Sequence, residues 1–458
     1  MLVTSMSKSV AAILVLFFMV GSCVAVKPAL SAADVIEDSW ASKAPMHVAR
    51  RSLSVAVVNG KIYAIGGNAE NGYVSTNEEY NPATDTWTYK KPMPTPRYRF
   101  ATAVYQNKIY CIGGVTSDGY YSNESIAGVN EVYDPATDTW ETKEPIPTPR
   151  RGLGAKVVNG KIYLIGGYVP DSSISTGFSI LSLNEVYDPE TDSWTTKAEV
   201  PTAVSSVVSA VVDSKIYIIM SDLNQIYDAD TDTWSLGTSL PHSSVMSARA
   251  EAATGVNAPK RIYVFGGGET QVYDPDSDSW TFGADMPADR DNFGVAVVND
   301  ILYTIGGYTA TYQNYPDDWM YGPSITLYAT NERYTPFGYG TVPPAVSVAS
   351  PENGNHTSGD VSLAFTVNKP AVWMGYSLDN QDNVTVTGNV TISGLANGLH
   401  NITVYARDDF DNVGASEIII FSVAEEPFPV APVTAASVAA VAVVGVGLLV
   451  YYFKKRRH

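Results

Sequence analysis

The sequence contains little cysteine and little histidine, and both shortages restrict its chemistry. Only two of the 458 residues are cysteine and five are histidine. Cys23 lies in an apolar N-terminal stretch and Cys111 in a short apolar run, so a disulfide framework is excluded as the source of stability. The chain has no zinc-type spacing, Ser-His-Asp set or phosphate-binding glycine loop. We therefore predict no metal, no cofactor and no catalytic residue.

Basic residues are also scarce. The chain has 29 Lys and Arg residues against 47 Asp and Glu residues, which gives a formal net charge of −18 and a pI near 4.6. This charge excludes nucleic acid and anionic lipid surfaces as partners of the body of the protein. Charged residues make up 17% of the chain and hydrophobic residues 45%, a balance that is typical of a globular protein rather than a disordered one.

Long apolar runs are missing from the body of the chain and occur only at its two ends. Lys8 precedes an apolar stretch over 10–20, which predicts a signal peptide over residues 1–33, with an uncleaved anchor as the alternative. Residues 430–453 are free of charge and predict a transmembrane helix, with a buried helix as the alternative. The basic residues 454–458 then form a cytoplasmic tail. These features predict a single-pass protein of the cell membrane whose body lies outside the cell.

What the sequence does contain is a repeated phrase with a period of about 40 to 50 residues. An apolar run ends in a glycine pair, a tyrosine follows, usually within Tyr-Asp-Pro, and a tryptophan comes seven residues after the tyrosine. The glycine pairs are Gly66-Gly67, Gly113-Gly114, Gly166-Gly167, Gly266-Gly267 and Gly306-Gly307; a sixth copy has Ile219-Met220 instead. The Tyr to Trp steps are Tyr80 to Trp87, Tyr133 to Trp140, Tyr187 to Trp194, Tyr227 to Trp234 and Tyr273 to Trp280. Such a period indicates stacked units that bury their apolar faces against one another.

This phrase resembles the kelch repeat, and the resemblance covers residues 34–340. It implies an all-β fold, a β-propeller with one four-stranded blade per repeat. In the first repeat, we predict strands at 54–58 and 61–65, joined by a hairpin turn at Asn59-Gly60. The Asp and Pro after each tyrosine are interpreted as turn formers, with a calcium site as the alternative.

The count of repeats predicts how the ring closes. There are six inner-strand units, but the last tyrosine, Tyr334, has no tryptophan seven residues later. A spare tryptophan, Trp40, stands ahead of the first unit. We therefore predict that the N-terminal segment supplies the outer strand of the last blade, which gives six closed blades and leaves no open sheet edge.

After the repeats, residues 341–424 alternate in short strand-like stretches and predict an immunoglobulin-like β-sandwich. A short linker over 425–429 joins it to the predicted span. Five Asn-x-Ser/Thr triplets predict glycosylation sites, four of them in this domain: Asn123, Asn355, Asn383, Asn389 and Asn401.

The predicted ligand site lies at the propeller face that gathers the between-blade connections and the loops from second to third strand. At the start of the inner strands we expect a set of arginines near the axis: Arg50, Arg97, Arg150, Arg249 and Arg290. The long loops add exposed aromatic residues: Tyr73, Tyr121, Tyr168, Tyr308 and Trp319. The family resemblance implies that such arginines bind ligands. Together they would form an anion-binding mouth; in the alternative, each arginine pairs with a carboxylate of a neighbouring blade.

The sequence thus predicts a cell-surface binding or adhesion protein that recognises a glycan or a protein. A rival hypothesis is an extracellular carbohydrate-active enzyme, similar to a kelch sugar epimerase, with Arg and His as its working groups. His47 and His242 are the histidines of the propeller. A purely structural envelope component is a third possibility.

Overall fold

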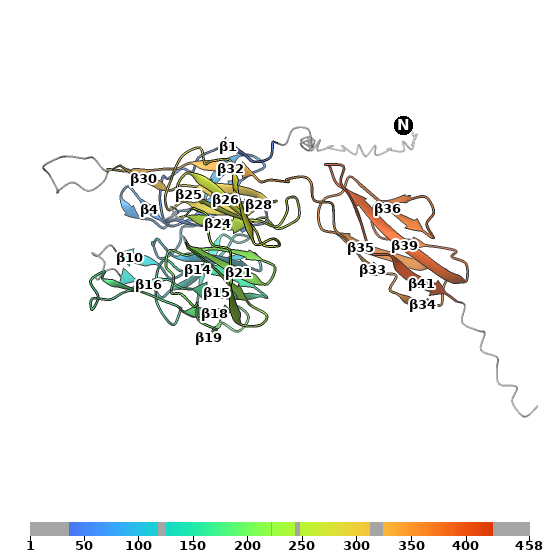
Figure 1. The fold of residues 1–458 in the computed structure, drawn as a ribbon, viewed down its shortest axis with the longest axis horizontal. Helices are drawn as coiled ribbons and strands as arrows, with labels where there is room; N and C mark the ends of the chain where they lie inside the picture. Colours follow the sequence, from blue (N-terminus) through green and yellow to red (C-terminus); the bar gives the residue numbers. More distant parts are fainter. Residues whose placement is uncertain (1–35, 118–124, 221, 243–247, 312–323, 425–458) are drawn as a thin grey trace, which may run out of the picture.

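The computed structural model describes residues 36–117, 125–220, 222–242, 248–311 and 324–424, and all regular elements in these ranges are β-strands (Figure 1). The predicted signal peptide, linker, membrane span and basic tail lie outside these ranges. Within the part of the chain that the structure describes, no helix is long and apolar enough to cross a membrane.

Residues 39–335 form six four-stranded antiparallel sheets, the blades. Blades 1 to 3 are, from the axis outward, β2 (Ser54–Val58), β3 (Lys61–Ile65), β6 (Asn77–Asn81), β7 (Thr86–Lys90); β8 (Ala101–Tyr105), β9 (Lys108–Ile112), β12 (Asn130–Asp134), β13 (Thr139–Lys143); and β14 (Gly154–Val158), β15 (Lys161–Ile165), β18 (Asn184–Asp188), β19 (Ser193–Thr196). Blades 4 to 6 are β20 (Val208–Val212), β21 (Lys215–Met220), β22 (Leu223–Asp228), β23 (Thr233–Gly237); β24 (Arg249–Ala252), β25 (Ile262–Gly266), β26 (Glu269–Asp274), β27 (Ser279–Gly283); and β28 (Gly294–Val298), β29 (Ile301–Ile305), β32 (Asn331–Thr335), β1 (Ser39–Lys43). Each inner strand contacts the inner strands of the two adjacent blades, and β28 returns to β2, so the ring is closed.

The closing blade confirms the prediction from the tryptophan count. Strand β1 pairs with β32 and brings Trp40 opposite Tyr334, as Trp87 lies opposite Tyr80 in blade 1. The indole ring of Trp40 packs on Phe265 of blade 5, with ring centroids 5.3 Å apart. One sheet is thus built from both ends of the propeller segment, and β32 has no open edge.

The repeated Tyr, Asp and Trp residues clamp each blade to the one before it. In blade 2, the Tyr133 hydroxyl donates to the Asp138 carboxylate at 2.6 Å, and that carboxylate accepts the amide N–H of Lys91 at 2.9 Å. The Trp140 indole N–H donates to the carbonyl of the same Lys91 at 2.9 Å. All six blades repeat this arrangement, and in the closing blade the carboxylate is that of Asp38. The residues whose backbone N–H and carbonyl take part are Ala44, Lys91, Glu144, Ala198, Thr238 and Ala284. The Asp carboxylates therefore accept hydrogen bonds from backbone N–H groups of the preceding blade.

The clamps predict an acid-sensitive contribution to stability. The hydrogen bonds from Tyr133 and Lys91 hold the pKa of Asp138 below its usual range. A carboxyl with a depressed folded-state pKa stabilises the fold above its unfolded pKa of about 3.9, and this contribution is lost as the pH falls through the folded value. We expect Asp138→Asn to lower the melting temperature at pH 7, with a difference that shrinks below about pH 4. Scanning calorimetry across this range measures it; a difference independent of pH would contradict the account.

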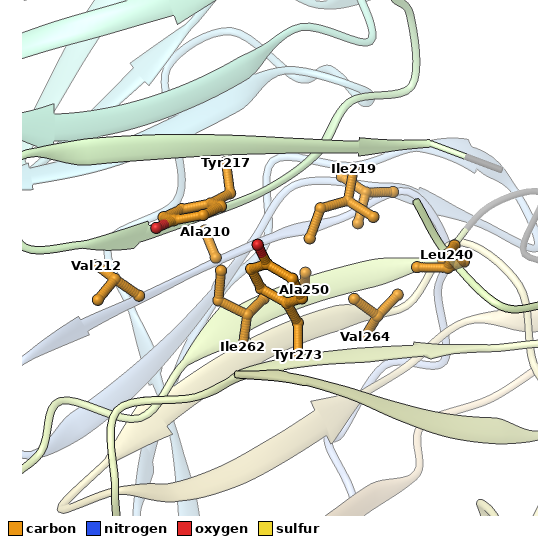
Figure 2. Packing of buried hydrophobic residues seen from close by; sticks show 11 residues of the cluster. Ala210, Val212, Tyr217, Ile219, Leu240, Ala250, Ile262, Val264 and Tyr273 are labelled. Carbon is orange, nitrogen blue, oxygen red and sulfur yellow. The ribbon is translucent and has the colours of Figure 1, made fainter. Parts of the chain in front are cut away.

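Blade 4 replaces the glycine pair but keeps its packing. In blades 1, 2, 3 and 6, both glycines of the pair have positive φ. A Cβ on Gly113 of blade 2 would lie 2.7 Å from the carbonyl oxygen of Arg150. In blade 4, β21 instead continues to Met220, which pairs with Leu223 of β22. Figure 2 shows Ile219 and Tyr217 of this strand facing Val264 and Tyr273 of blade 5 in a buried apolar cluster.

Blade 5 also departs from the glycine-pair pattern. Its strand β25 runs through Gly266, which pairs with Glu269, and Gly267 and Gly268 form the turn with positive φ. Blades 4 and 5 therefore both have tight connections between their second and third strands.

The other four blades carry a small hairpin in this connection. The hairpins are β4 (Asn68–Ala69) with β5 (Gly72–Tyr73), β10 (Val115–Ser117) with β11 (Ser125–Ile126), β16 (Tyr168–Pro170) with β17 (Phe178–Ile180), and β30 (Tyr308–Thr311) with β31 (Ser324–Leu327). They lie at one end of the propeller, and we call them the crown.

Residues 346–423 form two sheets around a separate core. The first contains β33 (Val346–Ser350), β35 (Val361–Val367) and β38 (Val390–Ile392); the second contains β34 (Gly354–His356), β41 (Ile419–Val423), β39 (Gly398–Arg407), β36 (Trp373–Leu378), β37 (Val384–Val386) and β40 (Val413–Ala415). Leu363 and Phe365 of the first sheet share a buried cluster with Val404 and Phe421 of the second. The immunoglobulin-like class of this sandwich stays a prediction.

The sandwich contacts the propeller at the end opposite the crown (Figure 1). Gly340 donates its N–H to the carbonyl of Asn257, in the loop from first to second strand of blade 5, at 2.7 Å. Asn412 of the sandwich donates to the Gly340 carbonyl at 2.6 Å. Asp300 is buried and its carboxylate accepts four backbone N–H groups of the same loop, from Thr254 to Ala258. The crown therefore faces away from the sandwich.

Candidate functional site

Four of the predicted ligand-binding arginines are interior ion pairs. Arg50, Arg97, Arg150 and Arg290 are 0–1% exposed and pair with Glu78, Glu131, Glu185 and Glu332, each in the third strand of the arginine's own blade. Arg50 also donates to the backbone carbonyls of Val48 and Ala64. Burial lowers the pKa of Arg50, Arg150 and Arg290, and the facing glutamates raise it. The prediction that these four guanidinium groups form an exposed anion-binding mouth is therefore wrong, since no ligand reaches them there.

The two blades that lack the buried arginine also lack the buried glutamate. In blade 4, Val204 takes the arginine position and Gln225 takes the glutamate position, and both are fully buried. Gln225 accepts from the Thr202 N–H at 2.8 Å and donates to its carbonyl. In blade 5, Gln271 makes the same pair of contacts with His242. Both charges are absent together because an unpaired buried charge costs several kcal/mol.

Arg249 has a different place from the other four arginines. It is the first residue of β24 and pairs with Phe265, as Ser54 of blade 1 pairs with Ile65. It therefore stands four positions further along the repeat than Arg50. This register puts its side chain at the wall of the axial channel, partly buried, instead of inside a blade.

A cavity of about 140 Å³ opens on the axis at the crown end of the inner strands. Arg99 and Arg249 line it, together with small polar residues that include Ser52, Ser209 and Asn292. The channel continues into a more apolar cavity of about 340 Å³, which Lys156 and Glu251 line. These two residues form an ion pair at 2.5 Å across the channel. The upper cavity is therefore the part of the channel that combines cations with hydroxyl and amide groups.

Tyrosines of the crown surround this opening and contact its arginines. The Arg51 guanidinium lies 4.6 Å from the ring centroid of Tyr308, and that of Arg151 lies 3.8 Å from the ring of Tyr168. Arg99 donates to the Tyr168 hydroxyl at 2.5 Å. The backbones of Arg51 and Arg151 pair with the first residues of two hairpins, which fixes the cations beside the crown. We call this set the mouth: Arg51, Arg99, Arg151, Arg249, Asp291, Tyr98, Tyr168 and Tyr308.

The charges of the mouth act on one another. Desolvation and the neighbouring positive charge of Arg99 lower the pKa of Arg249 to about 10, and Asp291 opposes this effect. Arg249 thus stays protonated at neutral pH. Burial and the nearby Asp289 raise the pKa of Asp291, which weakens the negative charge available to balance the cations. Two guanidinium groups held close together at the rim of a cavity favour an anionic group between them.

Several predicted site residues lie in or beside the mouth. Tyr168 and Tyr308 belong to it, and Tyr73 stacks on Tyr98 with ring centroids 6.3 Å apart. Tyr121, Trp319 and Asn123 lie outside the described residues. The sequence interpretation missed Arg51, Arg99 and Arg151, which stand one or two positions after the buried arginines. The sequence feature that could have identified them is the second arginine in each Arg-Arg or Arg-Tyr-Arg run.

The two propeller histidines do not line the axial cavity. His47 bonds to the buried Glu78 at 2.6 Å and stacks on Tyr89. His242 bonds to Glu269 at 3.0 Å and packs on Phe282 of the outer strand of blade 5. No group of His, Cys, Asp and Glu residues in the described ranges is arranged to hold a metal ion.

Comparison with known proteins identifies the family. Residues 34–221 and 131–307 match the protein-family model described as the KLHDC2/KLHL20/DRC7 Kelch-repeats domain, and together they span more than half of the chain. The chain belongs to the kelch-repeat family. Its ring is accordingly a kelch propeller, a protein-binding fold. The Tyr, Asp and Trp clamps explain why these residues recur at fixed positions in its repeats.

Relatives of this kelch propeller match parts of the chain. Kelch-like protein 26 of Danio rerio is 29% identical over 182 residues, 40% of this chain and 29% of that protein. Halomucin of Haloquadratum walsbyi is 41% identical over 86 residues, 17% of this chain and 1% of that protein. The chain spans less than a third of the length of either relative. A solved structure titled "Structure of YjhT" has a TM-score of 0.50 at 16% identity and covers 62% of this chain and 98% of that one, which shows the fold alone.

Proposed function

We propose that this kelch protein is a cell-surface binding protein that recognises an anionic partner at the mouth of its propeller. The single observation that carries the proposal is the pair Arg99 and Arg249, whose guanidinium groups line one cavity on the axis. In a protein of net charge −18, such a local concentration of cations steers acidic ligands to one place.

The direction of the mouth supports a role at a surface. The crown faces away from the sandwich, and the sandwich precedes the predicted membrane span over 430–453. With that span in the membrane, the sandwich would act as a stalk and present the mouth outward. Three of the four predicted glycosylation sites of the sandwich, Asn355, Asn383 and Asn389, are exposed, and Asn401 is partly buried. An immunoglobulin-like, glycosylated stalk belongs to this proposal.

The placement of the histidines disfavours the rival enzymatic function. A sugar epimerase built from Arg and His needs both groups on one substrate. Here His47 and His242 are bonded to glutamates and packed on aromatic rings of outer strands, away from the cavity that Arg99 and Arg249 line. We therefore propose binding without turnover.

Removal of the mouth arginines tests the proposal. The purified protein is screened on arrays of sialylated, uronate-containing and sulfated glycans and of acidic peptides. We expect Arg99→Ala and Arg249→Ala each to weaken the best hit at least about tenfold, since each removes a charge-assisted hydrogen bond. Higher salt is expected to weaken the parent complex as well.

Lys108→Ala is the matched control, because it removes an equal charge from the opposite end of blade 2 at a partly exposed position. It should leave binding unchanged. The proposal fails if both arginine variants bind every hit as tightly as the parent protein.

A further inference from the structure

We propose that the inner part of the axial channel is a second ligand site, which binds an uncharged amphipathic small molecule with an aliphatic tail and an alcohol or amide head. The site is the cavity of about 340 Å³, which we call the lower chamber. The described residues that line it do not include Arg99 or Arg249, so the inference goes beyond the proposed function and does not rest on it. It is carried by an apolar ring and by an ion pair that replaces two alanines.

The wall of the lower chamber is a ring of half-buried aliphatic side chains at one register position of the inner strands. In blade 1 this position is Val57, which pairs with Ile62 one residue before the end of β2. The residues at this position in the six blades, which we call the collar, are Val57, Val104, Val157, Val211, Ala252 and Val297. Collar side chains cannot hydrogen-bond to water, so an aliphatic group that replaces water between them is favoured.

The size of the lower chamber suits a small molecule. A volume of about 340 Å³ falls within the range of small-molecule sites in proteins. At the ~30 Å³ that one water occupies in the liquid, it holds roughly eleven heavy atoms. A tail of about six to eight carbons together with its polar head therefore fits.

One position before the collar, two blades depart together from the residue that the other four share. Each inner strand here pairs with a tyrosine of the second strand. Four blades carry a buried alanine at this position, namely Ala56, Ala103, Ala210 and Ala296. Blade 3 carries Lys156 instead, and blade 5 carries Glu251. The Lys156 Nζ and Glu251 Oε1 atoms lie 2.5 Å apart, although blade 4 separates their strands.

This ion pair gives a mostly aliphatic chamber one strong donor and one strong acceptor. Lys156 and Glu251 line both cavities of the channel, so the pair lies where the two cavities meet. Their side chains are 15% and 33% exposed, which leaves polar atoms within reach of a ligand. A hydroxyl or amide head can accept from the ammonium group and donate to the carboxylate without separating them.

The same pair disfavours a charged head. Its two charges cancel, so it offers no net attraction to an ion. A carboxylate head would be repelled by Glu251 and an ammonium head by Lys156. Either ion would also lose its hydration against the aliphatic collar, which is costly. The chamber therefore selects an uncharged head.

Three probes that share a six-carbon tail test the inference: 1-hexanol, hexanoate and hexylammonium. The full-length protein, labelled with carbon-13 in its valine methyl groups, is titrated with each probe and followed by NMR. Val157→Ala and Val211→Ala assign collar signals. We expect hexanol to shift the collar signals and to bind at least about tenfold more tightly than either ion.

Two double variants test the role of the ion pair. Lys156→Ala/Glu251→Ala introduces the alanine that four blades already carry, so the variant should fold. We expect it to weaken hexanol binding at least about tenfold, because hydrogen bonds to two charged groups are lost. Lys156→Glu/Glu251→Lys is the matched control. It reverses the pair but keeps one donor and one acceptor, and it should bind hexanol within about threefold of the parent.

Three results would overturn the inference. Hexanoate or hexylammonium binding as tightly as hexanol would exclude selection of an uncharged head. A double alanine variant that binds hexanol like the parent would show that the ion pair does not recognise the ligand. Collar signals that no probe shifts would exclude the lower chamber as a ligand site. None of these results involves the mouth arginines, so each is distinguishable from failure of the proposed function.

Discussion

Arg150→Val is expected to destabilise the propeller by about 3–5 kcal/mol, because it leaves the Glu185 carboxylate buried without its cation. The Arg150 guanidinium also donates to the carbonyls of Leu164, Gly166 and Thr148, which would lose these partners. The chemical denaturation midpoint at pH 7, with unchanged slope, measures the effect.

The double variant Arg150→Val/Glu185→Gln reproduces the pair that blade 4 carries naturally, Val204 with Gln225. We expect it to recover the part of the lost stability that comes from the unpaired Glu185 charge, because the neutral pair leaves no buried charge. The two substitutions should thus be strongly non-additive. Simple addition of the two single effects would show that the glutamate is not held by the arginine and would contradict the interior ion pair.

Deletion of residues 36–43 is expected to have the second large effect, since it opens the ring. The deletion removes the strand β1, the Trp40 ring between Phe265 and Tyr334, and the Asp38 clamp on Ala284. Loss of the partly buried Trp40 ring costs at most about 3–5 kcal/mol, and the exposed edge of β32 would promote association between chains. We expect a lower melting temperature and oligomers in size-exclusion chromatography.

A synthetic peptide of residues 34–46, added in trans, is the control for the deletion. It supplies the missing strand and should restore the monomer and much of the melting temperature, as strand addition does at other open edges. A deletion variant that melts like the parent without the peptide would contradict closure of the ring by β1.

The sequence predicted most of the ring because the ring depends on strictly spaced residues. The seven-residue step from Tyr80 to Trp87 is the length of one hairpin that puts the two rings opposite each other. The turn residues Asn59 and Gly60, both with positive φ, fixed the register of the inner hairpin. The spare Trp40 revealed the closing strand, because an outer strand without its tryptophan leaves the preceding blade uncovered.

The site was predicted less well, because of two arginines one or two residues apart, one is buried in its blade and the other lies at the mouth. Arg150 turns into its blade and meets Glu185, whereas Arg151 remains beside the crown on Tyr168. Spacing from the inner strand identified the buried member of each run. The buried glutamates could have signalled this, since Gln225 replaces glutamate where Val204 replaces arginine. Arg249 lies four positions further along the repeat than Arg50, because the connection between β24 and β25 is longer than the corresponding turn in blade 1. The spacing of the other repeats does not predict this longer connection.

Hydrogen–deuterium exchange of the full-length protein, with and without the tightest-binding array ligand, tests the central claim most directly. We expect the ligand to slow exchange at the mouth, in the backbone around Arg99, Tyr168, Arg249 and Tyr308, and to leave the Asp-containing turns at the opposite end unchanged. Protection confined to those turns, or to the sandwich over 346–423, would contradict the placement of the binding site at the mouth of the propeller.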